Sequence, residues 1–428
     1  MHRKESNFFK VIIKFKNYLL LRKKIFLFSS FFLLFSTYSF SMDSMAILPN
    51  GIYSTGWKQG QIINADQKFT SQGELYSLSD LNSIEFNVEK LKTIEPDIKV
   101  LENALNKFGQ NSLGSNLNLG VLKLTTEPTI KYSVLTFGRG INDNWMLGLG
   151  IPIITYKNNL TYSHSGSNLK NLQSQFSGLS KSIDDAFNKL DKNIISLAQQ
   201  NLKDKGYKPI QNRNETFLGD IQVASFYMLY KESFLGVRWQ SFLNLPTGPK
   251  DDPNDLADLT SFGKTAWENS LLLNMNFWSN LNFAIRCGFK WSIPDTVLVR
   301  VPENDEDSLP NSMRLSLVNR KIGDSINSGA SMTYSFSNGF ALSMGLDSNY
   351  KNKDSFSGAM IGSYSPLEKD TKSYTHRIQY EVSYDSVSYF LNKKAILPVI
   401  FSINYSDSFR GQNIERLTQT EMNSTFFF

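Results

Sequence analysis

The stretch LNFAIRCGFKWSI, residues 281–293, alternates between two kinds of side chain over its whole length. Every second residue from Leu281 to Ile293 is apolar or cysteine, whereas the positions between them are small or polar and include Arg286 and Lys290. This pattern predicts a β-strand with one apolar face, because successive side chains of a strand point to opposite sides. The strand would be about twice the usual ~5–6 residues of globular sheets and long enough to cross a bilayer.

Similar segments recur along the chain, separated alternately by short turns and by long polar connections. Aromatic residues gather at the segment ends, as at Trp145, Trp278 and Tyr384. We expect about twelve strands, at 51–63, 128–139, 144–157, 219–230, 234–246, 266–278, 281–297, 322–336, 340–351, 373–387, 395–407 and 419–428. An even number of long strands, with short turns at one end and long loops at the other, is typical of outer-membrane barrels.

These features predict an all-β protein, a transmembrane antiparallel up-and-down β-barrel whose apolar face is turned toward lipid. The alternative is a soluble periplasmic β-protein, in which the apolar faces would be turned inward. The length of the strands and the aromatic residues at their ends favour the membrane barrel.

Two of the long connections, at 85–109 and 167–206, have apolar residues at helical spacing. Pro96 interrupts the first segment, and Gly109 and Gly206 end the two segments, as expected for helices. We therefore expect helical insertions in long outer loops of the barrel. Their apolar stripes need burial, and packing of the two segments on each other is favoured over a plug of the barrel mouth or a partner site.

Residues 1–41 have the pattern of a secretory signal peptide. Three basic residues, 22–24, precede the apolar run 25–35, and small residues suited to cleavage come before Met42. The run is too short to span a bilayer as a helix, and an N-terminal membrane anchor is the alternative. These 41 residues hold eight of the 45 basic residues and one of the 39 acidic ones. The rest, 42–428, is nearly neutral, so we predict one barrel domain that does not bind nucleic acid.

Little in the sequence indicates catalysis. Cys287 is the only cysteine, so neither a disulfide framework nor a thiolate metal cluster is predicted. His376 falls on the lipid-facing side of its strand and Ser373 on the other side, which argues against a Ser–His hydrolase. The acidic loop at 245–258 could bind Ca²⁺, but a solvated loop is favoured because its spacing matches no EF-hand. We therefore expect no enzyme, no metal site and no cofactor.

Charged residues on the other faces of the strands are expected to point into the barrel, because a charge that faces lipid is costly. They would line an aqueous lumen and set its selectivity, or pair across a closed one. A barrel of about twelve strands lies between filled and open barrels in width, and an open channel is favoured. The six candidate lumen residues are Arg238, Arg286, Lys290, Asp347, Arg377 and Glu381.

Four segments resemble known outer-membrane proteins. LTFGRGINDNWMLGLGIPIITY (135–156) resembles the strand-turn-strand of proteins grouped with the meta-pathway phenol-degradation family, in which a G(L/I)TDN turn precedes a GxGxP strand. FLGDIQVASFYMLY (217–230) and LNLPTGPKDDPNDLADLTSFG (243–263) are similar to that family's GxGD and LPTGxxDD segments, in the same order. Residues 47–78 resemble the N-terminal strand and loop of related barrels. The resemblance implies a barrel related to fatty-acid and hydrocarbon channels, which pass small and often hydrophobic compounds, but it implies no functional residues.

We interpret the sequence as an outer-membrane channel for small solutes, hydrophobic compounds among them, that works by passive diffusion. One alternative is a surface structural or adhesin-like barrel with a closed lumen, whose helical loops bind a partner. A less favoured alternative is an outer-membrane hydrolase. The expected partners are outer-membrane lipid, the barrel assembly machinery and a small-molecule solute.

The chain ends in EMNSTFFF, residues 421–428, which is unusually apolar for a terminus. As a last strand it would place Phe426 and Phe428 on one face, at the interfacial aromatic girdle. A terminal aromatic residue on an amphipathic last strand also resembles the signal that barrel assembly machinery recognises. We therefore predict that Phe426 and Phe428 form an assembly signal.

Overall fold

The structure is a computed structural model. It describes residues 47–63, 66–77, 83–87, 103, 106, 118–176, 178, 181, 184, 185, 188, 196, 199, 200 and 202–428, except 257, 259–261 and 308. The predicted signal peptide at 1–41 lies outside the described residues and stays a prediction.

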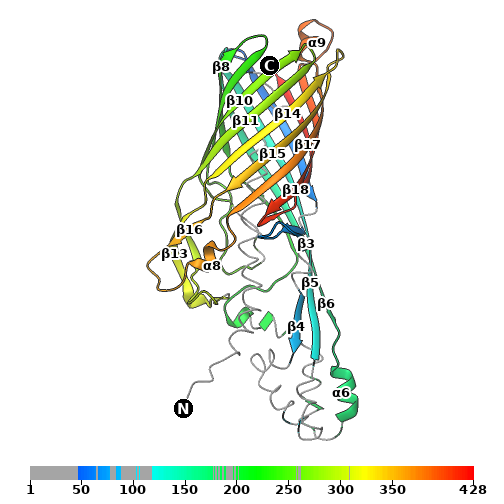
Figure 1. The fold of residues 1–428 in the computed structure, drawn as a ribbon, viewed down its shortest axis with the longest axis vertical. Coiled ribbons are helices and arrows are strands. Elements are labelled where there is room, and N and C mark those ends of the chain that lie inside the picture. The colour runs from blue at the N-terminus through cyan, green and yellow to red at the C-terminus, as the bar shows by residue number, and fades with distance from the viewer. Residues whose placement is uncertain are drawn as a thin grey trace.

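Twelve strands of the described chain form a closed antiparallel barrel (Figure 1). In order around the barrel they are β1 (Tyr53–Ile63), β5 (Asn118–Asn142), β6 (Trp145–Ser165), β8 (Gln222–Lys231), β9 (Leu235–Asn244), β10 (Ala266–Trp278), β11 (Leu281–Ser292), β14 (Ser325–Ser335), β15 (Phe340–Lys351), β17 (Ser373–Asp385), β18 (Val399–Gln412) and β20 (Thr418–Phe427). The predicted barrel and its strand number are confirmed.

The alternation of the sequence becomes the two faces of the barrel wall. On β11, Ile285 and Trp291 point outward and are 48% and 49% exposed, whereas Lys290 and Ser292 point inward and are 4% and 3% exposed. The same alternation continues on β15 and β17. A wall that is apolar outside and polar inside is the arrangement expected in a bilayer.

The barrel closes where the last strand pairs with the first. Ten successive register pairs join β1 to β20, from Ser54–Phe427 to Ile63–Thr418. The backbone N–H of Tyr53 donates to the carbonyl of Phe428 at 2.8 Å, and the N–H of Phe428 donates back at 3.0 Å. The C-terminus lies at the end of the barrel where the short turns and helix α9 (Val387–Leu391) also lie (Figure 1).

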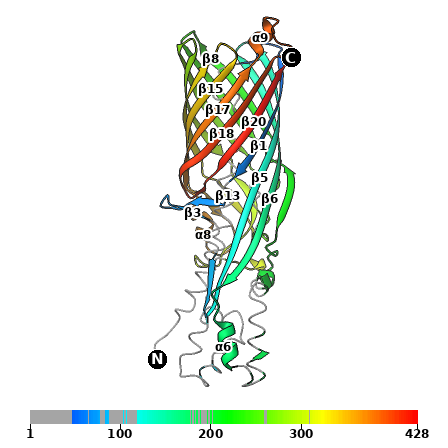
Figure 2. The same cartoon turned by 90° about the vertical axis from the view of Figure 1, so that its right-hand side faces the viewer.

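At the opposite end, β5 and β6 continue well beyond the other strands as a two-stranded extension, whose connecting turn lies at the short-turn end of the barrel (Figure 2). Strand β4 (Ser83–Asn87) pairs with the extension of β5, and β7 (Arg213–Leu218) pairs with β6. Helix α6 (Leu169–Phe176) follows β6 and lies near the far end of the extension. The predicted strands at 128–139 and 144–157 were too short, because the extension does not have the apolar face that identified the membrane part.

Two small sheets are formed by the long connections. One contains β2 (Gln67–Phe69), β3 (Leu75–Ser77) and β19 (Ile414–Glu415). The other contains β12 (Asp295–Arg300), β13 (Leu315–Lys321) and β16 (Ser355–Ser357), with η1 (Ser312–Arg314) and α8 (Ser365–Glu368) beside it. Val301, Val318, Phe356 and Leu367 form the core of the second unit.

The predicted strand at 281–297 is wrong in its last residues, because the barrel strand ends at Ser292 and β12 belongs to this loop sheet. Pro294 follows the end of β11 and has no N–H to continue the barrel ladder.

The two predicted helical segments are described only in part. The first is wrong over residues 85–87, because they lie in β4, which covers the free edge of the β5 extension. In the second, α6 occupies Leu169–Phe176 and Gly178 follows with a positive φ of 84°. The remainder of both segments lies largely outside the described residues, so their full extent stays a prediction. None of the helices that can be described is both long and apolar enough to cross a membrane.

Deleting residues 426–428 is expected to block assembly, because it removes the paired hydrogen bonds between Phe428 and Tyr53 and the end of the strand that closes the ring. The measurement is the amount of heat-modifiable, folded protein in the outer-membrane fraction. Ile361→Ser, at a loop position that is 92% exposed, serves as the control. Normal insertion of the truncated protein would refute the predicted assembly signal.

Candidate functional site: the barrel lumen

The six candidate residues all lie on the inner face of the barrel. Arg238 is on β9, Arg286 and Lys290 on β11, Asp347 on β15, and Arg377 and Glu381 on β17. Each occupies a buried or half-buried position that alternates with more exposed ones on its strand. Their role in selectivity stays a prediction.

Three of these residues meet around one carboxylate. Arg286 Nη2 lies 2.8 Å from Asp347 Oδ1, and Arg377 Nη2 lies 3.6 Å from Asp347 Oδ2. Gln379 also donates to Asp347. Gly329 occupies the register position between Arg286 and Asp347, and a Cβ there would overlap the carboxylate. The ion pair therefore reaches across β14, where only a glycine at position 329 leaves space for the two side chains to meet.

A second polar bridge has the same construction. Tyr132 on β5 donates its hydroxyl to Glu421 Oε1 on β20 at 2.6 Å, and Lys58 on β1 lies 2.9 Å from Glu421 Oε2. Gln419 Nε2 donates to the Tyr132 hydroxyl at 2.6 Å. Gly60 lies between Tyr132 and Glu421 in register, and the tyrosine ring fills the space that a Cβ at Gly60 would need.

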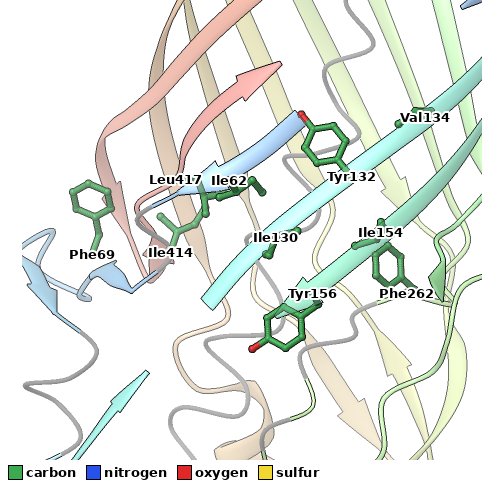
Figure 3. Packing of buried hydrophobic residues seen from close by; sticks show 10 residues of the cluster. All are labelled: Ile62, Phe69, Ile130, Tyr132, Val134, Ile154, Tyr156, Phe262, Ile414 and Leu417. Atoms are coloured by element: carbon green, nitrogen blue, oxygen red, sulfur yellow. The ribbon is translucent and has the colours of Figure 1, made fainter. Parts of the chain in front are cut away.

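An apolar cluster covers the inner face of β1, β5 and β6 at the end of the barrel where the long connections lie (Figure 3). It contains Ile62, Ile130, Tyr132, Val134, Ile154 and Tyr156 from the barrel strands, and Phe69, Phe262, Ile414 and Leu417 from the connections. Sequence reasoning missed this cluster. The signal was present, since the segments at 128–139 and 144–157 carry apolar residues on both faces.

A half-buried carboxylate, Asp220, holds the β9–β10 connection against the barrel. Its oxygens accept backbone N–H groups from Gly248 and Gly263 at 2.9 Å and from Lys264 at 3.3 Å. Burial raises the pKa of Asp220, and the three hydrogen bonds act in the opposite direction. These hydrogen bonds join the two segments, 217–230 and 243–263, that carry the family resemblance. In the same region the ring centroids of Phe217 and Phe262 lie 5.3 Å apart.

The acidic loop differs from the expected solvated loop. Asp255 and Asp258 are 5% and 6% exposed, Arg213 forms an ion pair with Asp255, and the backbone N–H of Asp252 donates to Asp258 at 2.7 Å. Nearby Lys264 is also buried, which lowers its pKa to about 8. Among the residues that the structure describes, no group of His, Cys, Asp and Glu is arranged to hold a metal ion.

His376 points outward, as predicted, and Ser373 points inward. The structure adds a neighbour that the sequence did not reveal, since Ser348 Oγ lies 2.7 Å from His376 Nδ1 on the outer surface. The other neighbours of the His376 ring are aromatic, Tyr374 and Phe409, and among the described residues no carboxylate takes the place of the orienting acid of a catalytic triad.

The two terminal phenylalanines lie on the outside of the seam. Phe426 is 40% exposed and Phe428 is 67% exposed, and the ring of Phe428 stacks 6.3 Å from that of Tyr53. Phe427 is turned inward and packs against the cluster around Met146 and Phe226. Their recognition by an assembly machinery stays a prediction.

Comparisons with known proteins support the fold. No family model and no curated protein matches this sequence. An outer membrane channel from Pseudomonas putida F1 superposes with a TM-score of 0.51 at 9% identity, covering 91% of this chain and 100% of that one. The NanC porin (TM-score 0.33, 11% identity, 71% and 97% coverage) and the toluene transporter TodX of P. putida (0.31, 9%, 89% and 90%) superpose too weakly to carry an argument. The chain thus has the β-barrel fold of the outer-membrane protein from Pseudomonas putida F1.

Gly60→Ala is expected to lower the free energy of unfolding by about 3 kcal/mol, through overpacking against Tyr132 and loss of its hydrogen bond to a charged group. Urea unfolding in lipid vesicles measures the change. Gly148→Ala is the matched control, because a Cβ there would meet Ala224 at an ordinary 3.5 Å. An effect of Gly60→Ala no larger than that of Gly148→Ala would contradict the account of this bridge.

Proposed function

We propose that the protein is an outer-membrane channel that passes small solutes, hydrophobic compounds among them, by passive diffusion. The observation that carries this proposal is the sidedness of the barrel wall: charged residues such as Arg286, Asp347 and Arg377 lie inside, and apolar residues such as Ile285 and Leu346 lie outside. Charged groups at membrane depth commonly mark a pathway for ions or solutes.

The proposed mechanism depends on the lumen and on its outer mouth. Inward charges select solutes by sign, and a barrel of this size can hold a narrow pathway. At the mouth, Phe69, Phe262, Ile414 and Leu417 from three different connections pack against the wall. We infer that these connections act as the gate.

Export and assembly complete the proposal. The segment 1–41 acts as a signal peptide, the barrel assembly machinery recognises Phe426 and Phe428, and the protein resides in the outer membrane of a Gram-negative-type cell. The apolar outer face then contacts lipid. Catalysis is not part of this proposal.

A second candidate is a surface structural or adhesin-like role, favoured by one observation. The paired strands β5 and β6 continue well past the other barrel strands, and α6 lies near the far end of this extension (Figure 2). In this role the extension would bind a partner. Shortening the extension would then abolish partner binding and leave solute uptake unchanged.

Single-channel recording in a planar bilayer tests the channel proposal. We expect conductance steps from the purified protein, and a reversal potential in a KCl gradient that shifts toward cation preference in Arg377→Gln, because an inward positive charge is lost. Ile285→Ala, on the outer face, is the control and should leave the reversal potential unchanged. Absence of conductance, together with unchanged solute uptake by cells that lack the protein, would overturn the proposal.

A further inference from the structure

Cationic and aromatic side chains lie together on the outer surface of β15, β17 and β18, at the end of the barrel where the long connections lie. The three strands are neighbours in the barrel wall (Figure 1). His376 pairs with Arg410 in register. Lys372 directly precedes β17, and its Nζ lies 5.4 Å from the centroid of the Tyr350 ring. We call six residues of this surface the rim cluster: Tyr350, Lys372, Tyr374, His376, Phe409 and Arg410.

A β-bulge in β18 turns Arg410 outward. Odd-numbered residues of this strand face outward as far as Phe409, so regular alternation would point Arg410 into the barrel. The register shifts here, because His376 pairs with Arg410 but Arg377 pairs with Ser408, and Phe409 is the extra residue. Phe409 and Arg410 are therefore both exposed. Bulges commonly re-aim a side chain, and this one places a cation on the lipid side of the wall.

The imidazole of His376 is held by three neighbours. Its Nδ1 lies 2.7 Å from Ser348 Oγ, and its ring centroid lies 5.5 Å from that of Tyr374 and 6.3 Å from that of Phe409. When the serine hydroxyl donates to Nδ1, the proton of a neutral imidazole is on Nε2 and can be donated to an anion. The rim cluster thus offers a third donor beside its two cations.

The two cations of the rim cluster are not neutralised by acidic side chains. In the described part of the chain, no ion pair joins Lys372 or Arg410 to a carboxylate. Asp407 lies nearby on β18, but its Oδ2 is 2.9 Å from Nη2 of Arg416, which compensates its charge. Asp370, on the connection before β17, is the acidic residue closest to Lys372 along the chain. Positive charge therefore exceeds negative charge on this surface.

An apolar surface adjoins the rim cluster on the side toward the middle of the barrel. Leu346, which is 50% exposed, pairs with Ile378, and two further register pairs extend this surface toward the short turns. These pairs are Met344–Tyr380 and Leu342–Val382. Such residues contact acyl chains, so the cations lie where lipid headgroups begin. Cations at this depth attract anionic headgroups, and a guanidinium can bind a phosphate through two parallel hydrogen bonds.

We propose that the rim cluster binds the phosphorylated headgroup of an outer-leaflet glycolipid. Arg410 and Lys372 bind phosphate oxygens, His376 donates a further hydrogen bond, and the acyl chains lie on the apolar surface beside the cluster. A free phosphate would meet the same cations but would gain nothing from that apolar surface. The inference does not depend on conduction through the lumen, so its failure would leave the proposed channel untouched.

Native mass spectrometry of the folded protein in an uncharged maltoside detergent tests the inference, with diphosphorylated lipid A as the probe. We expect one bound lipid A at concentrations at which dephosphorylated lipid A with the same acyl chains does not bind. Inorganic phosphate should displace the lipid only when it is present in large excess. Equal binding of the dephosphorylated lipid, or displacement by equimolar inorganic phosphate, would overturn the proposal.

The variants Arg410→Gln and Lys372→Gln should each weaken binding of lipid A about fivefold, because each removes one cation near the membrane surface. Arg139→Gln is the matched control. Arg139 Cζ also lies over a tyrosine, 5.2 Å from the centroid of the Tyr53 ring, but at the end of the barrel where the short turns lie, and its loss should leave the affinity unchanged. Unchanged affinity in both rim variants would contradict the proposal. If a variant fails the heat-modifiability test for folding, the comparison of the two lipids on the unmodified protein decides.

Discussion

The structure depends on one constraint: in a bilayer, each backbone N–H and C=O of the strands must find a partner within the protein. A sheet satisfies it only by leaving no edge, and here the pairing of β1 with β20 removes the last one. Once the ring is closed, alternation along each strand fixes two faces. Lipid contact requires apolar residues on the outer face, whereas the inner face can carry charged residues.

Much of the barrel could be predicted from the sequence, because lipid imposes its pattern on every strand that it contacts. The strands at 266–278 and 340–351 have the predicted bounds. The pattern fails where lipid ends. Before residue 128, β5 is stabilised by its neighbours β4 and β6 and not by an apolar face. Similarly, β12 follows Pro294 and belongs to a loop sheet.

The direction of the lumen charges could also be predicted, but their partners could not. Arg286 and Asp347 lie 61 positions apart, and Tyr132 and Glu421 lie 289 positions apart. Register across three strands brings them together, and a glycine on the middle strand lets them touch. The apolar cluster inside the barrel was missed for a related reason, since segments that are apolar on both faces were interpreted only for their lipid side.

The most direct test of a lipid-facing surface around an aqueous lumen uses the single cysteine. Cys287 is exposed on the outer face of β11, whereas Thr333 on β14 points inward and is half-buried. In folded protein in vesicles, a small membrane-impermeant thiol reagent should leave Cys287 unmodified and should modify the cysteine of Thr333→Cys in a Cys287→Ser background. Rapid modification of Cys287 with protection at position 333 would contradict the account.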